Sequence, residues 1–240
     1  MDISYWIQSN PKITVGHTAK KYYGKYLYKM VLYAPAGRLI LSNGDIAQEI
    51  EFRKNYNPGG SWWYRRNHQS SVSSADVVLL EQLRNLKRAN LPGIKMRVEE
   101  PRIQVYAQTD DDMRNIIETY IPAYKSHIES VFGPEDEEAE AILNSGAIIR
   151  KNDLGYRYKV IIKDGTFPTE VKESLYVYLA NLGPDLVHVP KGTMDMLLKS
   201  TSYIWNCYFY SNDEGINTMV RLMSPDLISN CHELVVLPHK

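Results

Sequence analysis

The 240-residue chain carries 28 basic and 28 acidic side chains, so its formal net charge at pH 7 is zero. A neutral molecule has no overall field that would drive nonspecific association with nucleic acid or a membrane, so any electrostatic site must be local. No segment approaches the roughly 20 apolar residues of a membrane-spanning helix, and the polar start MDISYWIQSNPK does not resemble a signal peptide. The sequence therefore predicts a soluble cytoplasmic protein with no membrane partner, in which Cys207 and Cys231 are reduced.

The first predicted elements are a tyrosine-rich strand at 26–33 and, after a long polar stretch, a helix at about 75–89. Ser74 precedes this helix and has a hydroxyl that can cap its free amides. The apolar residues at helical spacing are Val78, Leu79, Leu83 and Leu86. This spacing predicts an amphipathic helix that packs on a sheet.

Two short strands follow at 95–100 and 102–108, and Pro101 between them indicates a tight hairpin. A second helix is predicted at 110–120, because its first turn is acidic and acidic side chains stabilise a helix N-terminus. The segment 126–132 supplies a fourth strand. This half of the chain therefore has the order βαββαβ.

The same order returns after the acidic, glycine-containing segment 134–155. The predicted elements are a strand at 156–163, a helix at 168–182, strands at 186–190 and 202–210, a helix at 213–223 and a strand at 231–237. The motif Tyr-x-Tyr-Lys begins both halves, at 26–29 and 156–159, and the segment 105–122 matches 208–225 at a constant offset. Agreement across a strand, a helix and the proline after it indicates an internal duplication.

This order resembles RRM and related ferredoxin-like domains, and a tandem pair of such domains resembles the CRISPR repeat-processing endoribonucleases. The resemblance covers about 20–132 and 150–237 and concerns topology alone, because neither RRM consensus motif and no glycine-rich loop near the C-terminus is present. It implies an α+β protein with two tandem βαββαβ ferredoxin-like halves, each an antiparallel sheet with helices on one face. The predicted divisions are half one at 1–133 with an insertion at about 34–74, an acidic linker at 134–155 and half two at 156–240.

The apolar stripes of the four predicted helices define a candidate core. Its members are Leu79, Leu83, Ile116, Ile117, Leu175, Leu179, Met219 and Val220. All eight are expected to be buried.

The most distinctive local feature is the insertion of half one, which has no counterpart in half two. Its residues Asn57, Pro58, Gly59 and Gly60 predict a turn that presents Trp62, Trp63, Tyr64, Arg65 and Arg66. Aromatic rings stack on unpaired bases and arginine neutralises phosphate, so this composition is typical of single-strand binding. The same two tryptophans are equally consistent with anchoring a long loop to the core.

A basic, tyrosine-rich stretch precedes this insertion. Lys20, Lys21, Lys25 and Lys29 alternate with tyrosines, and ten basic and three acidic residues lie between Lys12 and Arg66, a net charge of +7. Such a concentration of charge in a neutral protein favours a polyanionic ligand, although a solvated surface is the commoner origin of one charge cluster.

Strand alternation places more cations and aromatic rings on single faces of half two. The alternating sets are Arg157, Lys159 and Lys163 in its first strand and Asn206, Tyr208 and Tyr210 in its third. If the two faces coincide, the sheet presents basic and aromatic groups on the side away from the helices. In half one the corresponding set is Arg102, Gln104 and Tyr106, which is one residue out of register with the constant offset.

Catalytic motifs are weak. The six histidines have no metal-ligand spacing, two cysteines cannot form a tetrathiolate site, and no phosphate-cradling glycine motif is present. His17 or His68 has the chemistry of a general base in RNA cleavage, and Asp110, Asp111 and Asp112 have the chemistry of a Mg²⁺ site. The same aspartates already have a structural reason at a helix start, so no cofactor and no metal is expected.

The sequence thus favours a nonenzymatic accessory protein, of a kind that phages and mobile elements encode, whose partner is single-stranded RNA or DNA or a nucleoprotein complex. Lysine and arginine would contact phosphate, and the tryptophans and Tyr64 would stack on bases. Two alternatives remain. One is a protein-interaction, assembly or inhibitor module that uses the Trp-rich loop, and the other is a metal-independent endoribonuclease.

Overall fold

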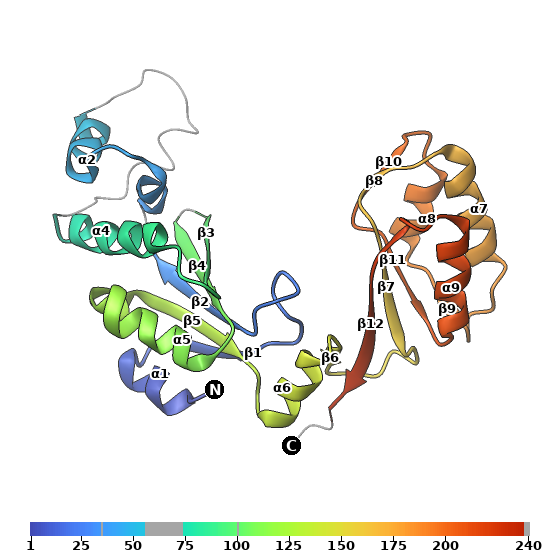
Figure 1. The fold of residues 1–240 in the computed structure, drawn as a ribbon, viewed down its shortest axis with the longest axis horizontal. Helices are drawn as coiled ribbons and strands as arrows, with labels where there is room; N and C mark the ends of the chain where they lie inside the picture. Colours follow the sequence, from blue (N-terminus) through green and yellow to red (C-terminus); the bar gives the residue numbers. More distant parts are fainter. Residues whose placement is uncertain (35, 56–73, 100, 238–240) are drawn as a thin grey trace. The chain divides into compact units, whose positions relative to one another are not determined.

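The computed structural model describes residues 1–34, 36–55, 74–99 and 101–237. The chain divides into two compact units. Unit 1 is Met1–Glu140 and unit 2 is Ala141–Lys240. Both are α+β, and each contains a five-stranded mixed sheet (Figure 1). No helix within the described residues is both long and apolar enough to cross a membrane.

Unit 1 begins with a short helix and an edge strand and continues into the first predicted repeat. Its elements are α1 (Ile3–Ser9), β1 (Thr14–His17), β2 (Tyr28–Tyr33), a 3-10 helix (Gly37–Leu41), α2 (Ile46–Asn55), α4 (Ser74–Ala89), β3 (Lys95–Glu99), β4 (Arg102–Ala107), α5 (Asp110–Asn115), a π-helical turn (Ile116–Tyr120), a second 3-10 helix (Pro122–His127) and β5 (Ile128–Gly133). The strand order is β1-β5-β2-β4-β3.

Unit 2 repeats this arrangement with an additional small sheet. Its elements, with α6 (Glu137–Asn144) across the boundary, are β6 (Ile148–Arg150), β7 (Tyr158–Ile162), β8 (Gly165–Thr166), α7 (Thr169–Ala180), β9 (Val187–His188), α8 (Lys191–Leu198), β10 (Tyr203–Ile204), β11 (Tyr208–Ser211), α9 (Glu214–Met223) and β12 (Ile228–Val236). The large sheet has the order β6-β12-β7-β11-β9, and β8 pairs with β10 alone.

The prediction of purely antiparallel sheets is wrong, because each sheet has one parallel edge. β1 pairs in parallel with β5, and β6 pairs in parallel with β12, whereas the other pairings within the two large sheets are antiparallel. Both edge strands precede the predicted repeats and are only 4 and 3 residues long. Such short strands carry too little alternation to be recognised from sequence. The segment 134–155, predicted as a linker, contains α6 and β6.

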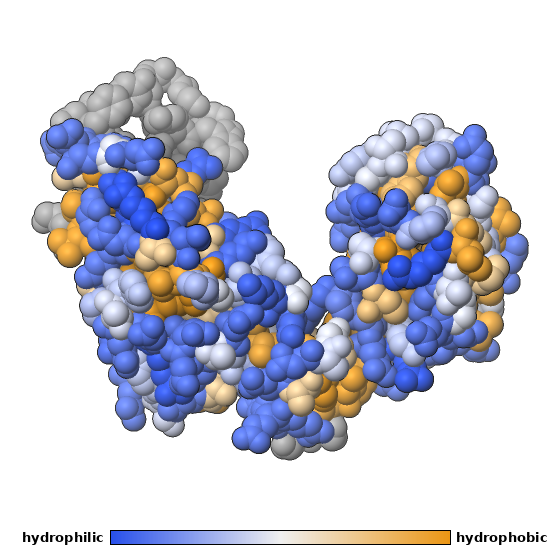
Figure 2. Space-filling view, viewed as in Figure 1, coloured by the Kyte–Doolittle hydropathy of each residue, from blue (hydrophilic) through white to orange (hydrophobic). Residues whose placement is uncertain are grey.

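Helices cover one face of each large sheet (Figure 1). In unit 1 this face carries buried Met30, Ile103 and Val105, and in unit 2 it carries buried Val160 and Phe209. We call the opposite side of each sheet its open face. Figure 2 shows hydrophilic residues over much of the visible surface, with apolar residues in separate patches.

Seven of the eight predicted core residues are buried, and Met219 is not, with 46% of its surface exposed. In α9 the buried line runs through Ile216, Asn217 and Val220, so Met219 projects to the side of it. Val78 in α4 is also exposed, at 59%, because Leu79, Leu80, Leu83 and Leu86 form the buried stripe. One helical position rotates a side chain by about 100°, which is enough to leave the core.

The predicted single strand at 202–210 is broken. β10 and β11 lie on either side of Asn206, whose φ of 53° is left-handed, and the Asn206 amide donates to the Asp164 carboxylate at 2.7 Å. Asparagine tolerates this conformation better than most residues because its short polar side chain can hydrogen-bond locally. The break shifts the alternation of side chains by one residue.

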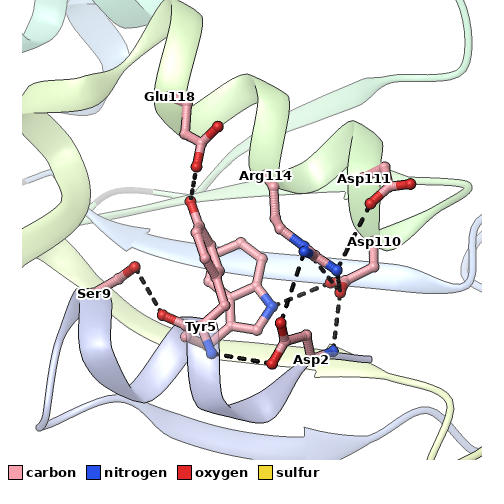
Figure 3. A network of polar contacts seen from close by, with 8 residues as sticks. Asp2, Tyr5, Ser9, Asp110, Asp111, Arg114 and Glu118 are labelled. Atoms are coloured by element: carbon pink, nitrogen blue, oxygen red, sulfur yellow. Dashed lines mark hydrogen bonds and ion pairs between the residues drawn. The ribbon is translucent and has the colours of Figure 1, made fainter.

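An acidic group fastens the N-terminal helix of unit 1 to α5 (Figure 3). The buried Asp110 carboxylate accepts hydrogen bonds from the Trp6 indole at 3.1 Å, from the Asp2 amide at 3.0 Å and from Arg114 at 2.7 Å. Every partner is a protein group, which gives Asp110 a structural role. Among the described residues, no group of three or more His, Cys, Asp or Glu side chains is arranged to hold a metal ion.

Candidate nucleic-acid interface

The five loop residues of the predicted site, Trp62, Trp63, Tyr64, Arg65 and Arg66, lie outside the described residues. Their predicted contact with bases and phosphates therefore stays a prediction. The four lysines of the predicted site are described. Lys20, Lys21 and Lys25 lie in the segment between β1 and β2, and Lys29 lies within β2.

The segment before β2 forms a tight turn whose tyrosines lie near the open face. Tyr23 and Gly24 have φ values of 54° and 68°, and the Tyr22 carbonyl accepts from the Lys25 amide at 3.0 Å, as in a type I′ turn. Glycine adopts this conformation at no steric cost, whereas a tyrosine needs support from its surroundings. That support comes from Lys95, whose ammonium lies 3.6 Å from the centre of the Tyr23 ring.

Lys29 occupies the middle of the open face of unit 1. Its cross-strand neighbours are Tyr106 on β4 and Phe132 on β5. The Lys29 ammonium lies 4.2 Å from the centre of the Phe132 ring and 5.2 Å from that of Tyr22. Partial burial lowers the pKa of Lys29. Gly16 on β1 makes room for this arrangement, because a Cβ there would lie 2.6 Å from the Phe132 ring.

Tyr106 is covered by the tyrosines of the preceding turn. Its ring centre lies 5.4 Å from that of Tyr22, 5.1 Å from that of Tyr23 and 6.2 Å from that of Tyr26. Tyr106 is buried, while Tyr23 is about half exposed. A hydrogen bond from Arg97 to the Tyr23 oxygen, at 3.4 Å, lowers the pKa of Tyr23. The exposed aromatic ring of this cluster is therefore Tyr23, and Tyr106 supports it from below.

Carboxylates neutralise part of the charge on this face. Arg97 pairs with Glu99 at 2.5 Å, and Arg102 pairs with Glu129 at 2.5 Å. A shallow groove of about 700 Å³ runs beside the second pair, and its lining includes Lys12, Lys29, Phe132 and the Arg102–Glu129 pair. The groove therefore combines an aromatic wall with cations, but one of those cations already has an anionic partner.

Lys159 holds the matching position on the open face of unit 2. Its cross-strand neighbours are Tyr210 on β11 and His232 on β12. The Lys159 ammonium lies 4.0 Å from the centre of the Tyr208 ring and 5.8 Å from that of Tyr210. Each distance is within the range of a cation–π contact. The sheet therefore brings a lysine and two tyrosines onto the same face, as alternation along both strands predicts, and of the two rings Tyr208 is partly exposed while Tyr210 is buried.

Two further rings lie beside Tyr210 on this face. Tyr156, His188 and Tyr210 have pairwise centre separations of 6.0 to 6.1 Å and interplanar angles of 20° to 29°. His188 comes from β9, where it pairs with Tyr210, and it is exposed. The nearly parallel rings give this surface a flat aromatic area.

The two units thus place the same residue types at the same strand positions. Lys29 lies opposite Tyr106 and Lys159 lies opposite Tyr210, in strands that occupy equivalent places in the two sheets. The constant sequence offset pairs Tyr106 with Phe209 instead, which explains why the sequence faces seemed one residue out of register. Asn206, which alternation groups with Tyr208 and Tyr210, lies before β11, where its left-handed backbone interrupts the strand. Trp205, the residue before it, is half exposed.

The described histidines do not assemble a catalytic group. His17 lies on β1 opposite Gly133, His127 contacts the Ser126 hydroxyl at 3.1 Å, and His232 contacts the Gly146 carbonyl at 2.8 Å. His68 lies outside the described residues. The chemistry of both open faces is therefore that of cations and aromatic rings.

Comparison with known proteins adds no assignment. No protein-family model, no curated protein and no solved structure matches the chain.

Proposed function

We propose that this chain is a nonenzymatic protein that binds single-stranded nucleic acid on the open faces of its two sheets. The observation that carries the proposal is a lysine directly opposite a tyrosine in the strand register of both sheets, Lys29 with Tyr106 and Lys159 with Tyr210. A lysine attracts phosphate, and aromatic rings at its side stack on bases.

A single strand fits these surfaces better than a duplex. The half-exposed Tyr23 ring and the exposed His188 ring offer flat surfaces, and a base reaches such a surface only when it is not stacked within a helix. In duplex recognition most protein contacts go to phosphate and sugar or to base edges in the grooves. A surface with several rings and few cations therefore favours unpaired bases.

The proposal includes a duplication of one ferredoxin-like unit. Without their parallel edge strands, the two sheets have the orders β5-β2-β4-β3 and β12-β7-β11-β9. In each unit helical segments follow the first and the third of these strands in chain order, while unit 2 has a further helix, α8, between its second and third. Two tandem βαββαβ halves account for this agreement and for the Tyr-x-Tyr-Lys motif that begins both. Duplication would also explain why the lysine–tyrosine pair occurs twice.

The insertion of half one remains part of the proposal. Arg65 and Arg66 are expected to contact phosphate, and Trp62, Trp63 and Tyr64 are expected to stack on bases. Lys20, Lys21 and Lys25 are also expected to contact phosphate. The partner is single-stranded RNA or DNA, free or in a nucleoprotein complex.

A polarisation titration with labelled single-stranded RNA, single-stranded DNA and duplex at several salt concentrations tests the proposal. The variants are Lys29→Gln, Lys159→Gln and the two together. Lys87→Gln is the matched control, because Lys87 is an exposed lysine in the last turn of α4, on the helix-covered side of the sheet. Circular dichroism of each variant verifies folding.

We expect the wild-type chain to prefer single strands and to bind more weakly as salt rises. Each lost phosphate contact lowers the log–log salt slope by about 0.7 for a single strand, so the double variant should lose about 1.4. Lys87→Gln should leave the slope unchanged. Absence of binding at low salt, or an equal loss in the control, would overturn the proposal, and salt-insensitive binding to a protein partner would support the interaction-module alternative.

A further inference from the structure

A second aromatic surface lies outside the large sheet of unit 2, on the small sheet of β8 and β10. Tyr203 and Trp205 are each 50% exposed, and their ring centres lie 6.2 Å apart with an interplanar angle of 30°. Most tryptophans are largely buried, so an exposed one beside a tyrosine indicates a contact surface. Figure 1 places β8 and β10 at the end of the unit away from β6.

The backbone runs directly from Tyr203 and Trp205 into β11, whose open face carries Tyr208. Ile204, Cys207 and Phe209 are all buried in the core of unit 2. The residues that alternate with them are Tyr203 and Trp205 in one segment and Tyr208 and Tyr210 in the next, and these lie on the side away from that core. The left-handed Asn206 inserts one extra residue between the two segments, and the aromatic residues therefore stay on the same side.

Each part of this aromatic series has a lysine beside it. The Lys199 ammonium lies 5.7 Å from the centre of the Trp205 ring, and the Lys159 ammonium lies 4.0 Å from the centre of the Tyr208 ring. The nearby Asp164 carboxylate accepts a hydrogen bond from the Asn206 amide and so stabilises the turn between the two segments. The chemistry of the sheet face thus continues beyond the sheet.

Buried contacts fix the position of this extension. The Lys172 side chain of α7 is buried, and its ammonium donates to the Lys199 carbonyl at 2.6 Å and to the Thr201 carbonyl at 2.8 Å. The Phe167 amide donates to the Ser202 carbonyl at 2.9 Å. A buried lysine needs hydrogen-bond partners, so these bonds hold the segment that carries Lys199 and leads into Tyr203. The exposed rings therefore rest on a constrained backbone.

We propose that Tyr203, Trp205 and Tyr208, with Lys199 and Lys159, form one continuous track for single-stranded nucleic acid, which extends the binding site of unit 2 beyond its sheet. This inference rests on the proposed function. Each exposed ring takes one base, and the lysines contact the phosphates between bases. The track spans at most about 17 Å from residue 203 to residue 208, at roughly 3.3 Å for each extended residue. A strand of about four nucleotides or more would occupy it, in the range of single-strand sites.

Polarisation titration of the full chain with a labelled homopolymeric strand of about eight nucleotides tests the track. Trp205→Ala should weaken binding about 5- to 150-fold, which corresponds to a stacking energy of about 1–3 kcal/mol, with little change in salt slope. Trp205→Phe should retain much of the affinity because it keeps an aromatic face. Lys199→Gln should lower the log–log salt slope by about 0.7.

Leu222→Ala is the control, because Leu222 is an exposed apolar residue on α9, on the helix side of the same unit. Unchanged affinity in Trp205→Ala and an unchanged slope in Lys199→Gln, with Lys159→Gln still weakened, would overturn the track and leave the sheet-face proposal standing. No binding by the wild-type chain would overturn both. If Trp205→Ala lowers the thermal midpoint, the surface variant Lys199→Gln decides the result.

Discussion

The open faces of the two units share a lysine–tyrosine pair but differ in what surrounds it. In unit 1 the pair lies beside two carboxylates, Glu99 and Glu129, which form ion pairs with arginines, and Tyr106 lies under three other tyrosines. In unit 2 Arg157, two residues before Lys159, pairs with Glu233 at 3.2 Å, and the rings near Lys159 include the partly exposed Tyr208. The exposed His188 lies beside Tyr210 on the same sheet.

This difference assigns unequal roles to the two faces. A carboxylate near a phosphate site reduces the attraction for the ligand and occupies a cation that could otherwise contact it. The strand-paired tyrosines Tyr106 and Tyr210 are both buried, so stacking depends on the accessible rings. These are Tyr23 in unit 1 and Tyr208 and His188 in unit 2. We therefore expect unit 2 to contribute more of the binding energy than unit 1.

The largest expected effect separates the two faces of β11. Phe209→Ala removes a buried ring from the core and should lower the free energy of unfolding of unit 2 by about 3–5 kcal/mol. Tyr208→Ala, one residue earlier and on the open face, should reduce single-strand affinity and change stability much less. Urea denaturation and polarisation titration of both variants measure this. Equal stability losses would show that Tyr208 belongs to the core.

The next effect compares two aspartates, Asp110 and Asp213, that the constant sequence offset aligns. Asp110→Ala should lower the free energy of unfolding of unit 1 by about 1–3 kcal/mol, because it leaves the buried indole N–H of Trp6 without its acceptor (Figure 3). Asp213 only caps α9, through the Gly215 amide at 2.7 Å, so Asp213→Ala should cost unit 2 about 1 kcal/mol. Denaturation followed in each unit tests the order. A larger loss for Asp213→Ala would contradict it.

Removing a carboxylate from unit 1 should make its face more like that of unit 2. Glu129→Gln frees Arg102 from an exposed ion pair, whose contribution to stability is only about 0–1 kcal/mol. Affinity for a single strand should therefore rise, and the log–log salt slope should increase by up to about 0.7 if Arg102 reaches a phosphate. Glu173→Gln, an exposed position on α7, is the control. Weaker binding by Glu129→Gln would show that the ion pair itself is needed.

The smallest effect concerns Tyr5 in the N-terminal helix of unit 1. Partial burial, and then its hydrogen bond to Glu118 at 3.0 Å, raise the pKa of Tyr5 to about 12, from a usual value of 10.0. Between these pH values the folded state holds a proton that the unfolded chain has lost. Stability from this group is therefore complete below about pH 10 and falls as pH rises toward 12.

Tyr5→Phe should remove this part of the pH dependence. Denaturation midpoints of the wild-type chain and the variant, measured from pH 9 to pH 11.5, isolate Tyr5 because the other tyrosines are common to both. The wild-type midpoint should fall more steeply than that of Tyr5→Phe. Parallel curves would contradict the assignment.

Much of the fold follows from local sequence patterns. The spacing of Leu79, Leu83 and Leu86 indicates α4, and the helix starts at Thr109 and Asp213 are marked by side chains that accept hydrogen bonds from backbone amides. The edge strands β1 and β6 depend on pairing with distant strands. Because they are short and lack strong alternation, local patterns do not reveal them.

The candidate site was only partly predictable. The Tyr-x-Tyr-Lys motif identifies Lys29 and Lys159, because it repeats in sequence. The tyrosine opposite each lysine depends on strand register, which a sequence offset does not determine. Trp205 depends on the left-handed backbone at Asn206 and could not be assigned to a face from alternation alone.

Photocrosslinking of the full chain to a single strand with photoactivatable bases, followed by mapping of the crosslinked peptides, tests the central claim most directly. The account predicts crosslinks in β9 and β11 of unit 2, at His188 or Tyr208, and fewer crosslinks near Tyr23 or Phe132 of unit 1. Crosslinks confined to helix-side peptides such as α4 and α7, or no crosslinks under conditions where the strand binds, would contradict it.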